Sequence, residues 1–91
     1  MPASSEVAVA LPATVALHAR PAGRFVRLAM RFKSRVTVGA GDKETDAKSI
    51  LGVLALGATG GTMLVLRAEG EDAQEALDSL AECLRTLSES A

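Results

Sequence analysis

Hydrophobic residues recur at every second position in several short stretches of the chain, and this period predicts β-strands. The first stretch runs from Glu6 to Leu11, where valine and leucine alternate with alanine. Residues 35–38 and Thr62–Ala68 show the same alternation. The polar segment 43–47 follows the turn signal Gly39–Asp42, so we expect it to close a hairpin as an edge strand. The pattern therefore predicts four strands, three of them with one buried face.

Arginines and apolar residues form two opposite stripes between Arg20 and Phe32, which predicts an amphipathic helix. The arginine stripe consists of Arg20, Arg24, Arg27 and Arg31. The apolar stripe consists of Ala22, Phe25, Val26, Ala29 and Phe32. Pro21 fits only the first turn of a helix, because the backbone N–H that proline lacks has no intrahelical partner there. The helix should therefore begin at about His18 or Ala19.

Two further helices are predicted in the second half of the chain. The segment Ser49–Leu56 is short and apolar and begins with a good N-cap residue, and from Ala73 to Leu87 apolar residues recur with the helical period. Residues 12–17 and 57–61 are expected to be loops, and Met1–Ser5 a frayed terminus. The predicted order is β-α-β-β-α-β-α. Half-buried strands and one-sided helices favour a two-layer α+β sandwich, with helices over one face of an antiparallel sheet.

The composition limits the size and the chemistry of the protein. Its 91 residues suit a single domain, and a net charge of −1 argues against a general nucleic-acid binder. A single cysteine cannot form an intramolecular disulfide and favours a reducing compartment. One histidine and one cysteine cannot complete a usual zinc site, and we expect no metal or other cofactor. The longest apolar stretch, Val7–Leu17, is too short to span a membrane, so we expect a cytoplasmic protein.

The small net charge hides an uneven distribution. Residues 1–41 hold six basic residues and one acidic residue, whereas residues 42–91 hold four basic and ten acidic residues. The arginine stripe is either a solvated helix face or a docking surface for an acidic partner, since such charges steer association. For the acidic last helix we favour a solvated face.

His18 is the leading candidate for chemistry, because it precedes the first helix by one or two residues. Its ring would lie beside unpaired backbone N–H groups at the positive end of the helix dipole, which stabilise an anion such as a phosphoryl group. Arg20 adds a permanent cation with donors suited to phosphate. A histidine at a helix start is more often a cap or a surface residue, and its position alone leaves that alternative open.

The second helix offers another candidate surface. Ser49 is by default its N-cap, yet the helix carries more apolar residues than one side can bury. Leu51 and Leu54, at i and i+3, are candidates for an exposed apolar patch that binds a partner. A phosphate on Ser49 would place close to two negative charges at that patch and disfavour docking. By contrast, Cys83 lies in the apolar arc of the last helix, which favours a buried structural thiol.

Two motifs in the chain resemble those of a known family. Residues 17–22, Leu-His-Ala-Arg-Pro-Ala, resemble the active-site motif of HPr, the histidine-containing phosphocarrier of the phosphoenolpyruvate-dependent sugar phosphotransferase system. Residues 48–54, Lys-Ser-Ile-Leu-Gly-Val-Leu, resemble its regulatory-serine motif. The separation of the two motifs also fits, as do Leu56-Gly57 and Ala68-Glu69-Gly70. The resemblance covers nearly the whole chain.

This resemblance implies both a fold and a role. The fold would be an open-faced β-sandwich, a four-stranded antiparallel sheet covered on one face by three helices. The protein would be a carrier and not an enzyme: Enzyme I would pass a phosphoryl group to Nδ1 of His18, and His18 would pass it to the A domain of a sugar-specific Enzyme II. Arg20 would stabilise the phosphate. The implied docking residues are Ala19, Arg20, Arg24, Arg27, Leu51 and Leu54.

The resemblance also bears on regulation and backbone geometry. It implies that Ser49 is a site for an HPr kinase/phosphorylase, and we expect a monomer that neither binds nucleic acid nor inserts into a membrane. Family members usually have glycine where this chain has Ala16, which leaves the backbone geometry before His18 open.

Two other functions compete with the carrier. One is a purely regulatory module that acts through the serine alone, against which the presence of both His18 and Arg20 argues. The other is a small RNA-binding domain that uses the arginine stripe, although single-strand readers usually need exposed aromatic residues.

Overall fold

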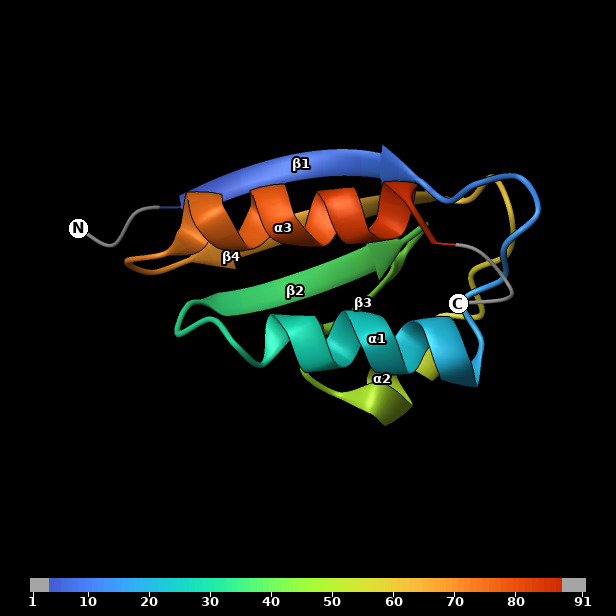
Figure 1. Ribbon diagram of the computed structural model, residues 1–91, viewed down its shortest axis with the longest axis horizontal. Helices are drawn as coiled ribbons and strands as arrows, with labels where there is room; N and C mark the ends of the chain where they lie inside the picture. Colours follow the sequence, from blue (N-terminus) through green and yellow to red (C-terminus); the bar gives the residue numbers. More distant parts are fainter. Residues whose placement is uncertain (1–3, 88–91) are drawn as a thin grey trace.

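The computed structural model describes residues 4–87, which form a four-stranded sheet and three helices (Figure 1). In chain order the elements are β1 (Ser4–Ala10), α1 (Ala19–Ala29), β2 (Arg35–Ala40), β3 (Lys43–Asp46), α2 (Ile50–Ala55), β4 (Met63–Glu69) and α3 (Ala73–Arg85). The predicted order β-α-β-β-α-β-α is confirmed.

The sheet is antiparallel throughout, with strand order β1-β4-β2-β3. The last strand in the sequence, β4, therefore lies inside the sheet between β1 and β2. The helices pack on one face of the sheet and leave the other face open (Figure 1). This arrangement confirms the predicted α+β fold, an open-faced sandwich.

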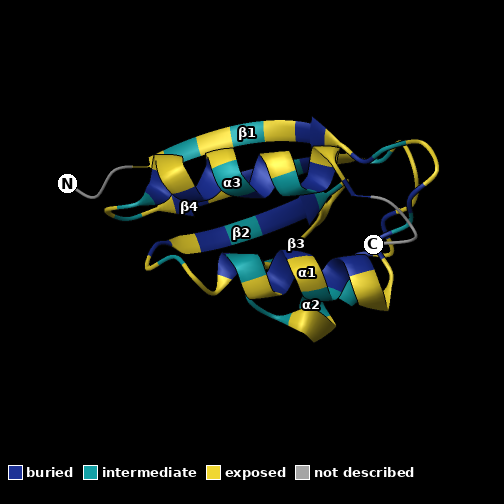
Figure 2. Ribbon diagram, viewed as in Figure 1, coloured by how far each residue is buried: buried dark blue, intermediate teal, exposed yellow. Residues whose placement is uncertain are grey.

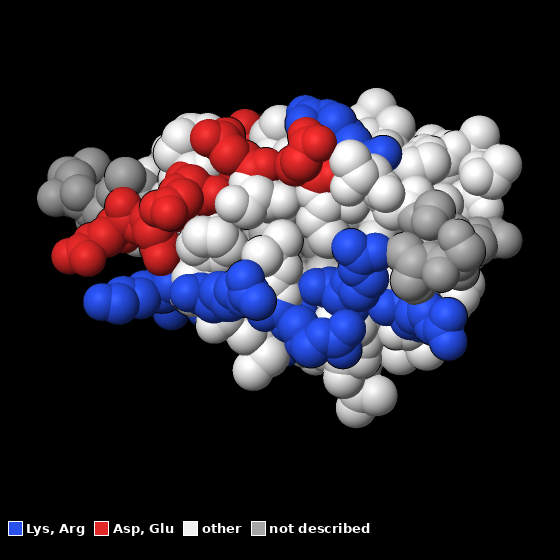
Figure 3. Space-filling view, viewed as in Figure 1, with Lys and Arg blue, Asp and Glu red and all other residues white. Residues whose placement is uncertain are grey.

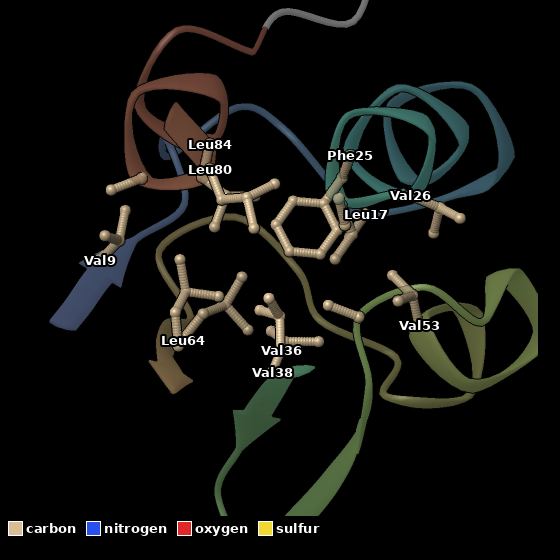
Figure 4. Close-up of a cluster of buried hydrophobic side chains, with 14 of the residues drawn as sticks. Val9, Leu17, Phe25, Val26, Val36, Val38, Val53, Leu64, Leu80 and Leu84 are labelled. Atoms are coloured by element: carbon tan, nitrogen blue, oxygen red, sulfur yellow. The ribbon is translucent and has the colours of Figure 1, made fainter. Parts of the chain in front are cut away.

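The alternation along the strands corresponds to burial. One face of the sheet is buried under the helices (Figures 2 and 4). Its buried strand residues include Val9, Val36, Val38, Leu64, Leu66 and Ala68. The helices contribute Phe25, Leu77, Leu80 and Leu84, all with at most 1% of their surface exposed. Apart from the buried Gly39, the positions on the other face are exposed or half-buried, so this face is open to solvent.

The first helix is shorter than its apolar stripe. α1 ends at Ala29, although the predicted stripe extends to Phe32. The N–H groups of Arg31 and Phe32 donate to the carbonyls of Leu28 and Ala29 at 3.0 and 3.2 Å, the i to i−3 spacing of a tightened last turn. Phe32 still packs against the core. The apolar stripe therefore predicts which residues face the core even beyond the end of the regular helix.

The terminus that was expected to fray belongs partly to the sheet. Ser4 and Ser5 are the first residues of β1 and pair with Glu69 and Ala68 of β4. The prediction is therefore wrong for these two serines, because β4 is long enough to supply backbone partners to polar residues. Residues 1–3 lie outside the described part of the chain.

The hairpin turn is shorter than the segment Gly39–Asp42 that the sequence indicates. Gly39 and Ala40 pair with β3 inside the sheet, so the turn is confined to Gly41 and Asp42. Gly41 has a φ of 63°, in the left-handed region that glycine adopts without a steric penalty.

The start of α3 is tied to the segment before β2 through the carboxylate of Asp72. Its Oδ1 accepts hydrogen bonds from the hydroxyl and the backbone N–H of Ser34, the latter at 2.9 Å, and its Oδ2 accepts one from the N–H of Lys33 at 2.9 Å. The bond from the Ser34 hydroxyl is the main cause that lowers the pKa of Asp72 to about 2. Gly70 makes room for this contact, because a Cβ at that position would lie 2.6 Å from the Ser34 hydroxyl oxygen.

Candidate functional site

His18 is the N-cap residue of α1, and its side chain is exposed. Its carbonyl accepts the first intrahelical hydrogen bond, from the N–H of Ala22 at 2.9 Å. The imidazole makes no capping hydrogen bond to the helix. The backbone of His18 thus begins the helix, whereas its exposed ring makes no capping contact with it.

The loop that leads to His18 is anchored by two buried side chains. Val15 and Leu17 are 1% and 3% exposed. The N–H of Leu17 donates to the carbonyl of Ala58 at 2.9 Å, which ties the loop to the segment after α2. A histidine that follows a buried and hydrogen-bonded residue has little freedom in its backbone position.

A second set of contacts fixes the beginning of the same loop. Leu11 donates to the carbonyl of Thr62 at 2.9 Å and accepts from the N–H of Gly61 at 3.1 Å. Gly60 lies against the loop, since a Cβ there would be 2.0 Å from the carbonyl oxygen of Ala13. Gly60 thus allows the predicted loop at residues 57–61 to pack closely against the loop before His18.

Ala16 does not strain this loop. Among residues 4–87, only glycines have a positive φ, so Ala16 lies outside the left-handed region. The geometry before His18 is therefore reached here without the glycine that relatives usually carry.

The first turn of α1 offers donors to an anion beside His18. The N–H groups of Ala19 and Arg20 precede the residues that make i to i−4 bonds, and Pro21 has no N–H. Arg20 is exposed and stands two residues after His18. Backbone donors and the positive helix end thus lie beside His18, and Arg20 adds a cation in the same first turn.

The predicted arginine stripe forms a continuous basic band over α1, whereas acidic side chains gather over α3 (Figure 3). Arg20, Arg24, Arg27 and Arg31 are all exposed. Within residues 4–87, none of these four makes an ion pair, since the three pairs present involve Arg67 and Arg85. The band is therefore available to acidic partners.

The start of α2 confirms the expected role of Ser49 as N-cap. The Ser49 hydroxyl oxygen accepts a hydrogen bond from the N–H of Gly52 at 3.1 Å. Of the predicted apolar patch, Leu51 is 77% exposed, whereas Leu54 is half-buried and packs against the core. The structure therefore places Leu51, but not Leu54, fully on the surface.

Three surface features of this region were missed by the sequence analysis. Met30 and Ile50 are exposed apolar residues, at 63% and 38%. The Lys48 ammonium donates to the carbonyl of Phe32 at 2.8 Å and so links the start of α2 to the end of α1. For Met30 the sequence offered only its spacing of four residues after Val26, which puts the two on the same side of α1.

Cys83 is less buried than expected. It is half-buried, and it lines a shallow groove between α1 and α3 together with Arg24 and Leu28. Burial raises the pKa of its thiol, and the charge of Arg24 opposes this effect. The position lies at the rim of the apolar arc of α3, where the groove meets solvent.

The described residues hold no group of three histidine, cysteine, aspartate or glutamate side chains that would suit a metal ion. In the same part of the chain, none of the helices has the length and apolar character that crossing a membrane requires.

Comparisons with known proteins show which family the chain resembles. The family described as "PTS HPr component phosphorylation site" matches residues 4–86. The phosphocarrier protein HPr of Haemophilus influenzae is 42% identical over 79 residues, which cover 87% of this chain and 93% of that protein. The HPr-like protein Crh of Bacillus subtilis is 49% identical over 65 residues, which cover 71% and 76%.

A solved structure shows the same fold. The crystal structure of a phosphocarrier protein HPr from Bacillus anthracis superposes with a TM-score of 0.87 at 36% identity, covering 91% of this chain and 99% of that one. The family match over residues 4–86 includes the loop before α1, His18 and all three helices. By family match, sequence and fold together, the chain belongs to the HPr phosphocarrier family of the phosphotransferase system.

Proposed function

We propose that His18 accepts a phosphoryl group from Enzyme I, itself charged by phosphoenolpyruvate, and passes it to the A domain of a sugar-specific Enzyme II. The observation that carries this proposal is the exposed imidazole at the start of α1, free of any capping bond and beside Arg20. The chain acts as a stoichiometric intermediate in a transferase relay and not as a catalyst of its own.

The chemistry needs one nucleophile and a place for negative charge. The lone pair of Nδ1 of His18 bonds to phosphorus while the bond between phosphorus and Enzyme I breaks, and the proton on Nε2 stays on the ring. Arg20 and the N–H groups of the first turn stabilise the phosphoryl oxygens. In the second transfer the P–N bond breaks as a nucleophile of the Enzyme II domain bonds to phosphorus.

Both partners would dock on the face that carries His18. The docking residues are Ala19, Arg20, Arg24, Arg27, Leu51 and Leu54. The exposure of Leu51 and of the arginines supports this assignment, and the half-burial of Leu54 gives it a smaller contact area. Arginines at the rim speed and orient the encounter with an acidic partner, whereas the apolar centre contributes most of the affinity.

Ser49 would be the regulatory site. A phosphate placed there by an HPr kinase/phosphorylase would stand one residue from Ile50 and two from Leu51. Its charge would disfavour burial of this patch under a partner and so slow the relay. The carrier is proposed to act as a monomer, which size-exclusion chromatography with light scattering would test.

The decisive test is charging in a purified relay. The protein is incubated with Enzyme I and phosphoenolpyruvate, and intact mass is measured before and after brief acid treatment. We expect one added phosphate that acid removes, and no added phosphate in His18→Ala. An unmodified wild-type protein, under conditions that charge a reference HPr, would contradict the proposal.

A further inference from the structure

A groove of about 440 Å³ lies between α1 and α3, and its volume is typical of small-molecule sites. One wall is formed by α1 and the turn that follows it, and this wall carries Arg24, Arg27 and Arg31. The opposite wall belongs to α3 and carries Ser79 and Cys83. Three arginines thus line one side of a concave surface, and a hydroxyl and a thiol lie on the other.

The positive charge of the arginine wall is not neutralised within residues 4–87. None of its three arginines makes an ion pair in this part of the chain. The one carboxylate among the described groove residues is that of Glu82, and the guanidinium of Arg85 lies 3.8 Å from it. An uncharged strip separates the basic band from the acidic side chains over α3 (Figure 3). The groove therefore keeps a positive potential, which favours an anion.

The charge of the arginine wall reaches the thiol of Cys83. Burial raises the pKa of this thiol, and the charge of Arg24 opposes the rise because its guanidinium is near the sulfur. Leu28 lines the groove beside them and packs against the core. A ligand held by the arginines would therefore lie over Cys83 and cover it.

The spacing of the arginines indicates the chemistry of the ligand. Arg24, Arg27 and Arg31 follow the spacing i, i+3 and i+7, which places them on one side of the helix. With a rise of about 1.5 Å per residue, the midpoints of the two successive pairs are about 5 Å apart along the helix axis. A phosphate group has three acceptor oxygens and close to two charges, so it can accept from two guanidinium groups at once, whereas a carboxylate has two oxygens and one charge. Two phosphate groups about 5 Å apart would therefore match the three arginines.

We propose that this groove binds a small molecule with two or more phosphate groups, held by Arg24, Arg27 and Arg31. The Ser79 hydroxyl adds a donor from the opposite wall. The groove runs along the side of α1 that faces α3, whereas the exposed imidazole of His18 lies at the helix start. The inference therefore does not depend on phosphoryl transfer through His18.

The first test measures the binding of inorganic tripolyphosphate, whose terminal phosphates have about this separation. Isothermal titration calorimetry is carried out at low ionic strength, because salt screens exposed arginines. We expect a Kd below about 1 mM, and a Kd at least about tenfold higher for orthophosphate, which engages one pair of arginines only. Citrate, a tricarboxylate, should bind at least about threefold more weakly than tripolyphosphate.

Arg31→Gln removes one guanidinium of the wall and should raise the Kd for tripolyphosphate about fivefold. Arg35→Gln is the matched control, since it removes the same charge from an exposed position at the start of β2, outside the groove. Its Kd should stay within about twofold of the wild-type value. An equal rise in both variants would indicate attraction to the overall charge and would overturn the site.

Cys83 gives a second readout that reports on the groove itself, because it is the only cysteine of the chain. Its alkylation by neutral iodoacetamide, followed by intact mass, should slow as tripolyphosphate is added, with a midpoint equal to the Kd from calorimetry. This midpoint should shift about fivefold in Arg31→Gln and stay unchanged in Arg35→Gln. Undetectable binding, binding that leaves the alkylation rate unchanged, or equal affinity for tripolyphosphate and citrate would each overturn the proposal.

Discussion

α1 and α3 each begin after an N-cap residue, but the side chains of these two residues have different roles. His18 and Asp72 are both N-cap residues, and neither side chain caps its own helix. The Asp72 carboxylate instead accepts three hydrogen bonds from Lys33 and Ser34, in a distant segment. The His18 imidazole stays exposed. A helix start can therefore secure the fold or remain available for chemistry, depending on whether another segment occupies its side chain.

The start of α2 stands between these two cases. Ser49 uses its hydroxyl for its own helix, through the bond from the N–H of Gly52. The Ser49 hydroxyl is a cap and is only partly exposed, so its modification would also change the acceptor at the start of α2. The three N-cap side chains thus differ in how much they stabilise the fold. Substitutions at these positions should therefore differ in their effects on stability and on charging.

The largest expected effect is the loss of function in His18→Ala without a loss of stability. Charging by Enzyme I should be abolished, because no other described side chain holds a nucleophilic nitrogen at this helix start. The free energy of unfolding should change by less than about 0.5 kcal/mol, as for other exposed positions without a structural contact. Urea titration checks the second part, and a strongly destabilised variant would show that the imidazole also serves the fold.

Arg20→Glu should slow charging on the order of 100-fold, since it replaces a donor to the developing phosphoryl charge by a repelling carboxylate. Stopped-flow or quench-flow measurement of phosphate transfer checks the rate. Arg35→Glu is the matched control, because Arg35 is exposed at the start of β2, outside α1. Equal slowing in both variants would indicate a general effect of net charge and remove Arg20 from the site.

Asp72→Asn should have the opposite profile, with lower stability and unchanged charging. The pKa of Asp72 is about 2 in the fold against an ordinary 3.8, so its carboxylate stabilises the fold fully above about pH 4. That contribution is lost as the pH falls from 3.8 towards 2. The difference in stability between wild type and variant, measured by urea unfolding, should therefore be greatest at neutral pH and shrink over this acidic range.

Glu71→Gln provides the control for that experiment, since Glu71 is an exposed neighbouring carboxylate. Glu71→Gln should show the same dependence of stability on pH as the wild type. If the difference in stability between wild type and Asp72→Asn stays constant down to pH 2, the charge of the carboxylate is not what stabilises this contact.

The smallest expected effect belongs to Ser49→Ala, which removes a cap and should cost about 1 kcal/mol of stability with normal charging. Ser49→Asp keeps an acceptor at the helix start and should keep stability, while its charge beside Leu51 should raise the KM for charging. Thermal unfolding and initial rates measure the two quantities. Normal charging kinetics in Ser49→Asp would argue against a regulatory role for a negative charge there.

The sequence predicted what depends on local periodicity and on helix ends. The buried faces of the strands, the start of α1 at Ala19 and the capping by Ser49 follow from residue spacing and are confirmed. The placement of His18 at a helix start was likewise predictable, because Pro21 fits only a first turn.

What the sequence could not supply depends on contacts between distant segments. Nothing local indicates that Ser34 would reach Asp72, or that Lys48 would reach Phe32. The half-burial of Leu54 and the exposure of Met30 depend on how α1 and α2 pack against each other. Helical spacing within one element does not determine this packing. The exposed arginine stripe on α1 was therefore predictable from the sequence, whereas the burial of each apolar residue beside it was not.

The position of β4 has a consequence for how the protein matures. The loop that carries His18 leaves β1, which pairs only with β4, and the same loop is hydrogen-bonded to residues 58–62 just before β4. During synthesis the histidine is made early, but the segments that hold it come much later. Non-local pairing of this kind is slow relative to helix formation. A nascent chain that stops short of β4 would therefore display the histidine motif without the segments that hold its loop in place.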